Sequence, residues 1–137
     1  MIRLFLYLIA PVFLSGCLST HVNLPRDSYL FVTKRVETKD CTGDQCSVSV
    51  SATTGSGFVL RSDSRGSWGV TAGHLCSWSP NGSEVLVIHD AIQVHLFGGG
   101  THSAVVAIVE PSVDICVIHI PNVEIPPVKV SRISPKL

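Results

Sequence analysis

Residues 92–109 read IQVHLFGGGTHSAVVAIV, and this stretch carries the clearest structural pattern of the chain. From Ile92 to Phe97, apolar side chains at every second position would share one face, as in a half-buried antiparallel strand. Three glycines at 98–100 then join this run to a second apolar run. Because such runs recur with turns between them, we expect an all-β sandwich or barrel and favour a closed antiparallel barrel.

Short β-rich runs occur along most of the chain, and nothing after residue 28 looks helical. The runs cover residues 29–36, 46–52, 57–61, 68–72, 84–89, 92–97, 103–109 and 114–120. One barrel of such short strands and hairpins takes roughly 60 to 100 residues, so we expect a single barrel over residues 29–120. The prolines after Ile120 predict an extended linker over residues 121–137.

The length and composition indicate a single domain of modest size. It has 137 residues, of which 45% are hydrophobic and 15% charged, which is far from a disordered composition. Its ten basic and ten acidic residues are scattered and give a formal net charge of zero. This distribution offers no electrostatic surface for nucleic acid, so we expect no nucleic-acid partner.

The first residues, MIRLFLYLIAPVFLSGC, have the order of a secretory signal: Arg3, an apolar run and a small-residue pair before Cys17. Residues 14–17, Leu-Ser-Gly-Cys, resemble the bacterial lipobox, which implies removal of residues 1–16 and attachment of lipid to Cys17. Two or three acyl chains hold a protein stably on a membrane surface. We therefore expect an extracytoplasmic protein, anchored to the cell membrane or outer membrane through a tether at 17–28. The alternative is an ordinary hydrophobic N-terminus with an incidental cysteine.

Five cysteines become four if Cys17 carries lipid, and an even number suits two disulfides in an oxidising compartment. Cys41 and Cys46 bracket the turn-like sequence Thr-Gly-Asp-Gln, so a local bridge between them is the favoured pairing. Cys76 and Cys116 are either bridged or two buried neighbours. Three connectivities remain open on the sequence alone.

Three segments in order resemble landmarks of trypsin-like serine proteases, and the likeness is closest to the HtrA type. They are Gly-Ser-Gly-Phe-Val at 55–59, Trp-Gly-Val-Thr-Ala-Gly-His-Leu-Cys at 68–76 and Val-Asp-Ile-Cys-Val-Ile-His-Ile at 113–120. The resemblance covers about residues 46–137 and implies the N-terminal, six-stranded antiparallel barrel of that fold. It also implies that His74 is a general base and that Asp114 orients it.

Those residue types suit the chemistry, because a serine hydroxyl is a poor nucleophile until a neutral imidazole takes its proton. A buried carboxylate then fixes the tautomer of the imidazole and stabilises its cationic form. Taken singly, His74 could be an ordinary histidine at a strand end, and Asp114 could be a carboxylate that caps a turn. The three ordered landmarks favour the catalytic interpretation.

The family nucleophile lies in a Gly-x-Ser-Gly loop of a second barrel, and the sequence shows no such loop after Asp114. Ser131 and Ser134 lack flanking glycines, and Ser56 lies before His74, where the family has a strand entry. We therefore expect a serine endopeptidase relative that is truncated or inactive as an isolated chain. A protein or peptide would be its substrate if a second barrel were supplied.

Two other interpretations stay open. The chain could be a non-catalytic, membrane-anchored binding or scaffold lipoprotein, with a dimer or partner on the apolar surface that a second barrel would cover. It could also be an unrelated β-barrel in which the landmarks coincide by chance.

We expect neither a metal nor a cofactor. The further histidines match no zinc signature; they are His21, His89, His95, His102 and His119. The glycines at 98–100 precede an expected strand rather than a helix, so they do not form a phosphate loop.

Overall fold

The computed structural model describes residues 25–77 and 85–130. The strands are β1 (Tyr29–Thr42), β2 (Gln45–Asp63), β3 (Gly66–Ala72), β4 (Leu86–Leu96), β5 (Thr101–Glu110) and β6 (Ile115–Pro121). Single 3₁₀ turns, η2 (Arg26–Ser28) and η3 (Pro111–Val113), precede β1 and β6, and the four-residue helix α2 (Gly73–Cys76) follows β3. The expected signal segment, Cys17 and residues 131–137 lie outside the described residues.

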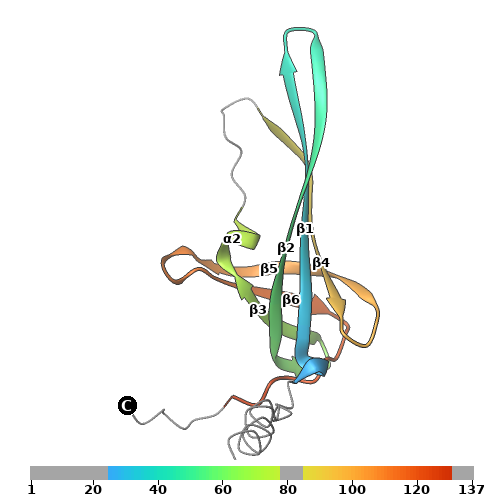
Figure 1. The fold of residues 1–137 in the computed structure, drawn as a ribbon, viewed down its shortest axis with the longest axis vertical. Helices are drawn as coiled ribbons and strands as arrows, with labels where there is room; N and C mark the ends of the chain where they lie inside the picture. Colours follow the sequence, from blue (N-terminus) through green and yellow to red (C-terminus); the bar gives the residue numbers. More distant parts are fainter. Residues whose placement is uncertain (1–24, 78–84, 131–137) are drawn as a thin grey trace, which may run out of the picture.

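The six strands form a closed barrel in the order β1-β2-β3-β6-β5-β4 (Figure 1). Every pair of neighbours runs antiparallel. The closed, six-stranded, antiparallel all-β barrel predicted from the sequence is therefore confirmed. Within the described residues, no helix has the length and apolar character needed to cross a membrane.

The β-rich runs are joined into fewer and longer strands than their spacing suggested. The runs at 46–52 and 57–61 both lie in β2, because the residues between them stay paired with β1. Gly55, between the two runs, leaves room for α2: a Cβ atom at this position would collide with the Leu75 side chain. In the same way, β4 continues through Asp90 and Ala91 into the run at 92–97.

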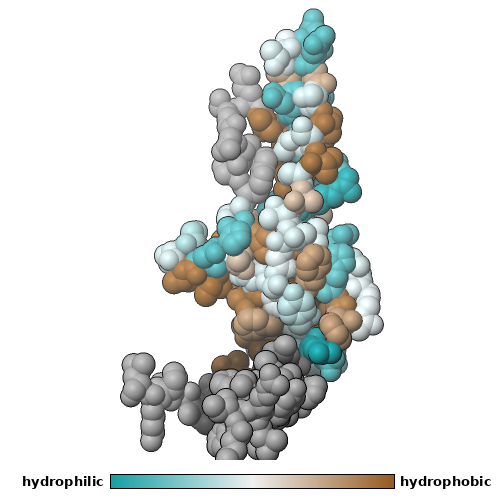
Figure 2. Space-filling model, in the orientation of Figure 1, coloured by the Kyte–Doolittle hydropathy of each residue, from teal (hydrophilic) through white to brown (hydrophobic). Residues whose placement is uncertain are grey.

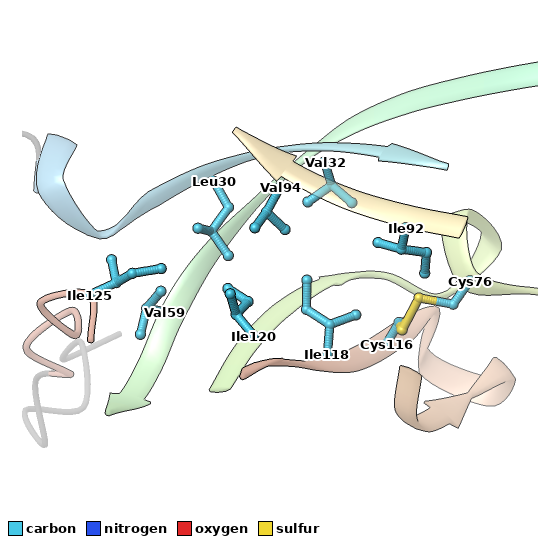
Figure 3. Packing of buried hydrophobic residues seen from close by; sticks show 10 residues of the cluster. All are labelled: Leu30, Val32, Val59, Cys76, Ile92, Val94, Cys116, Ile118, Ile120 and Ile125. Carbon is cyan, nitrogen blue, oxygen red and sulfur yellow. A yellow bond between two sulfur atoms is a disulfide. The ribbon is translucent and has the colours of Figure 1, made fainter. Parts of the chain in front are cut away.

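The core lies inside the barrel and follows from alternation along the strands. In β1, Leu30, Val32 and Val36 are buried while their neighbours Tyr29 and Phe31 are exposed. As expected, Ile92 and Val94 of β4 also face inward. The buried cluster, drawn in Figure 3, comprises Leu30, Val32, Val59, Cys76, Ile92, Val94, Cys116, Ile118, Ile120 and Ile125.

The residues after β6 pack against the end of the barrel. Ile125 is only 3% exposed and belongs to the core cluster. The Ser67 hydroxyl donates to the Val123 carbonyl at 2.6 Å and accepts the Ile125 N–H at 2.9 Å. Of the expected linker, Pro121 is the last residue of β6, and the described residues beyond it, up to Val130, have no regular strand or helix but help to close the core.

The described structure contains two disulfides. Cys41 and Cys46 bridge the end of the β1–β2 hairpin, as the turn between them predicted. Cys76 and Cys116 are bridged rather than merely adjacent, and they tie α2 to β6 inside the core (Figure 3).

We predict that the two bridges differ in their contribution to stability. Cys76–Cys116 spans a sequence separation of 40 and Cys41–Cys46 one of 5. By loop entropy, removal of the first costs about 4 kcal/mol and removal of the second about 2 kcal/mol. Thermal unfolding followed by circular dichroism should thus show a clearly larger loss for Cys76→Ala/Cys116→Ala than for the matched Cys41→Ala/Cys46→Ala variant. Equal losses would contradict the loop argument.

Candidate functional site

His74 lies just beyond the end of β3, in the short helix α2. Ala72, the residue before this helix, still has extended backbone angles, so the chain turns at Gly73. A Cβ atom at Gly73 would lie 3.0 Å from the Asp114 carbonyl carbon and the Ile115 nitrogen, closer than side chains normally pack. Glycine therefore allows the turn that carries His74 to approach the start of β6.

Asp114 occupies the junction between η3 and β6. Its backbone is left-handed, with φ 52° and ψ 47°, a conformation that aspartate tolerates better than most residues. The preceding turn is closed by the Glu110 carboxylate, which accepts the Ser112 N–H at 3.2 Å and its hydroxyl at 2.6 Å. The sequence predicted a strand beginning at Asp114, whereas β6 begins one residue later.

The structure brings His74 and Asp114 together through side-chain and backbone bonds. The His74 ring Nδ1 lies 2.8 Å from one carboxylate oxygen of Asp114 and 3.1 Å from the other. The His74 backbone N–H donates to the same carboxylate at 2.8 Å. The Gly73 N–H donates to the Asp114 carbonyl, also at 2.8 Å. Several independent bonds thus fix the orientation of the imidazole relative to the carboxylate.

These bonds hold Asp114 in its anionic form. The His74 side-chain hydrogen bond, reinforced by the His74 backbone N–H, lowers the pKa of Asp114 below its ordinary value of 3.8. A carboxylate can only accept, so the neutral imidazole must carry its proton on Nδ1. This tautomer leaves the Nε2 lone pair available to accept a proton.

Two further contacts hold α2 in place from inside the barrel. The Cys76–Cys116 disulfide joins the residue two positions after His74 to the residue two positions after Asp114. The Lys34 ammonium donates to the Cys76 carbonyl at 2.6 Å. It also pairs with the Asp90 carboxylate at 3.2 Å, and its own side chain is 6% exposed. Covalent and charged contacts therefore converge on the turn that carries His74.

Sequence analysis did not single out Lys34 or Asp90. The available signal was a charge at an inward position: Lys34 lies between Val32 and Val36 on the face of β1 that points into the barrel. A lysine on such a face needs a partner, because burying an unpaired charge is costly.

The His74–Asp114 pair is open to solvent in the described structure. The His74 side chain is 68% exposed and that of Asp114 56% exposed. The mechanism considered above invokes a buried carboxylate, so this part of the expectation differs from the structure. The reason is the position of the turn: Asp114 lies at the rim of the barrel, where its partners come from α2 alone.

No other candidate catalytic or metal site accompanies this pair in the part of the chain that the structure describes. No serine hydroxyl among residues 25–77 and 85–130 is hydrogen-bonded to the His74 ring. The Ser56 hydroxyl bonds instead to that of Tyr29 at 2.8 Å. In the same ranges, no three His, Cys, Asp or Glu side chains group as a metal site requires. Ser131, Ser134 and His21 lie outside the described residues.

Comparison with known proteins adds no relative: the chain matches no family model and no curated protein.

We predict that the His74 side chain controls the pKa of Asp114. In His74→Ala, this pKa should rise toward 3.8 but stay below it, because the backbone N–H groups of residues 73 and 74 still lower it. The stabilisation due to Asp114 is present above pH ~3.8 and is lost as pH falls through its lowered pKa. In His74→Ala this stabilisation should be smaller, and its loss should be complete at a higher pH, because the folded-state pKa lies closer to 3.8.

Carboxyl ¹³C shifts followed against pH measure this effect. Glu110, whose pKa is lowered by Ser112, serves as an internal control and should titrate identically in both proteins. His89→Ala, which removes an exposed histidine of β4, is the matched variant. If the pKa of Asp114 is the same in His74→Ala as in the wild-type chain, the contact with the His74 ring is not what lowers it.

Proposed function

We propose that this barrel carries the base and the orienting carboxylate of a trypsin-like serine peptidase, on a lipoprotein attached to a membrane through Cys17. The observation that carries the proposal is the bonding of one Asp114 carboxylate to both the ring and the backbone N–H of His74. The closed six-stranded barrel is compatible with the family that the sequence resembles.

In this proposal His74 acts through its Nε2 atom. The neutral ring accepts the proton of an attacking hydroxyl, and the Asp114 carboxylate then stabilises the imidazolium. The same proton passes to the leaving amine when the peptide bond breaks. Asp114 remains anionic throughout, in line with the lowering of its pKa by the two His74 donors.

The hydroxyl and the oxyanion-binding N–H groups would come from outside the described residues, on a second barrel. We infer that the 137-residue chain does not hydrolyse peptides by itself, because a base without a nucleophile leaves little besides binding. The second barrel could be encoded downstream of Leu137 or belong to another chain.

The alternative is a non-catalytic, membrane-anchored binding lipoprotein. A specific feature favours it: an apolar groove of about 610 Å³ beside the start of β1. Its walls are Pro25, Arg26, Tyr29, Phe58, Phe97 and Val128. Val128 belongs to the segment that leaves the barrel, so a second barrel joined to that segment would lie near the same groove. In a peptidase, the second barrel would thus cover the groove. In a binding lipoprotein, a separate protein would cover it.

A serine-directed fluorophosphonate probe separates the two functions. We predict no labelling of the 137-residue chain. The coding sequence beyond Leu137, or a partner chain, should supply Gly-x-Ser-Gly, and the combined protein should be labelled. Asp114→Asn should then lower kcat by about 10⁴-fold, because the imidazole takes the wrong tautomer.

His89→Ala is the matched control for that measurement and should leave kcat unchanged. Labelling of the 137-residue chain would contradict the division of the active site. Failure to find a Gly-x-Ser-Gly polypeptide that restores labelling would leave the binding lipoprotein as the function.

We predict separately that the mature chain begins at an acylated Cys17. Mass spectrometry of the N-terminal peptide from bacterial membranes should show diacylglycerol on this cysteine, and the protein should partition into detergent. The Cys17→Ser variant should keep residues 1–16 and lose the lipid. A mature terminus at any other residue would refute lipoprotein processing.

A further inference from the structure

The β1–β2 hairpin extends well beyond the barrel and presents a long unpaired edge (Figure 1). Residues 42–54 are all exposed. On one side β2 pairs with β1 from Gln45 to Phe58, but on the other side its pairing with β3 begins only at Gly57. Within the described residues, the segment from Cys46 to Thr54 therefore has a free edge.

The hairpin geometry shows which backbone groups line this edge. Cys41 and Cys46 lie directly opposite each other with Cα atoms 4.0 Å apart. So short a separation is typical of a non-hydrogen-bonded pair, in which the N–H and C=O groups point away from the partner strand. By alternation, Val48, Val50 and Ala52 also direct their N–H and C=O groups to the free edge.

The edge lacks the features that normally prevent strands from adding to it. Residues 45–56 read QCSVSVSATTGS and contain no charged residue and no proline. Natural edge strands are usually protected by lysine, proline, a bulge or a covering element. On one face of this edge, Val48 is 60% exposed and Val50 is 56% exposed. Figure 2 shows hydrophobic residues among hydrophilic ones on the surface of the extended hairpin. Leu86 of β4 continues that face, because both Val48 and Leu86 pair with Lys39.

We propose that the occupant of this edge is a second copy of the same chain, added antiparallel about a two-fold axis at Ser49. In this register Val48 lies opposite Val50 of the partner subunit, and Ser49 lies opposite its own symmetry mate. Val48 and Val50 both direct their N–H and C=O groups to the free edge. Each of the two symmetry-related Val48–Val50 pairs can therefore exchange hydrogen bonds between the strands.

Self-pairing at Ser49 is favoured over the neighbouring registers. An axis at Val48 or Val50 would leave one valine opposite Cys46 or Ala52. A slip by one residue would place valines opposite serines and reverse the faces. The charges also fit: Asp44 at the hairpin tip would lie beside a threonine, Thr54 of the partner subunit, so no like charges are opposed across the new pair.

Cysteine cross-linking in the full chain tests this register. In Ser49→Cys, the two introduced thiols would be directly opposite, with Cβ atoms about 5 Å apart, and mild oxidation should give a covalent dimer. Ser51→Cys and Ser47→Cys are matched controls. Each is separated from its own mate by four residues, or about 13 Å, and should not cross-link alone. A mixture of these two variants should form the mixed dimer.

Oxidation of the wild-type chain measures any background cross-linking through Cys17. Sedimentation of the wild-type chain in detergent measures association without an introduced thiol. We expect a dimer fraction that rises with concentration, because pairing of one edge buries less than the roughly 1,600 Å² of a standard interface. Val50→Pro removes an outward N–H without breaking a bond to β1, and it should abolish the dimer. Val48→Lys tests the same edge if the proline variant does not fold.

A chain that stays monomeric by sedimentation would overturn the proposal, as would equal cross-linking at residues 47, 49 and 51. A dimer that survives both Val50→Pro and Val48→Lys would also overturn it, since association would then use another surface. None of these results depends on the His74–Asp114 pair.

Discussion

The register between β3 and β6 is the constraint on which the rest of the molecule depends. Ala72 pairs with Ile115, and Thr71 pairs with Cys116. The residues that follow and precede the first pair, Gly73 and Asp114, therefore meet at the barrel rim and form a backbone hydrogen bond. A slip of one residue would turn the side chains of β6 to the opposite face. It would separate the candidate catalytic pair, break the buried disulfide and empty part of the core together.

This arrangement has a local cost. A non-glycine residue in the left-handed region, as Asp114 is, costs about 1 kcal/mol or more. The cost is tolerated because that backbone turn directs the Asp114 carboxylate and carbonyl toward the N–H groups of α2. Lys34 and the Cys76–Cys116 disulfide hold the other end of α2. The helix has only four residues and could not orient His74 by its own hydrogen bonds.

The sequence predicts the barrel well because its information is local. Alternation identifies inward residues such as Ile92 and Val94, and the turn between Cys41 and Cys46 predicts their bridge. Prediction from the sequence fails where the structure depends on contacts between residues that are far apart in the chain. The runs at 46–52 and 57–61 look like separate strands, yet Gly55 between them accommodates Leu75 while one strand continues. Lys34 is a charged residue at an inward position, and its hydrogen-bond acceptor, the Cys76 carbonyl, comes from the distant helix α2. Whether Cys76 and Cys116 are bridged or only adjacent likewise depends on the register between β3 and β6.

The exposure of the candidate site gives the proposed division of the active site a second physical basis. The pKa of Asp114 is lowered by hydrogen bonds while the group itself remains open to water. In that environment, solvent screens the attraction between the carboxylate and a developing imidazolium. A second barrel covering His74 would exclude this water and strengthen the same contact, besides supplying the hydroxyl. Under the proposed function, the geometry of the His74–Asp114 pair is therefore already in place, and its electrostatic effect would be fully developed only once a second barrel covers it.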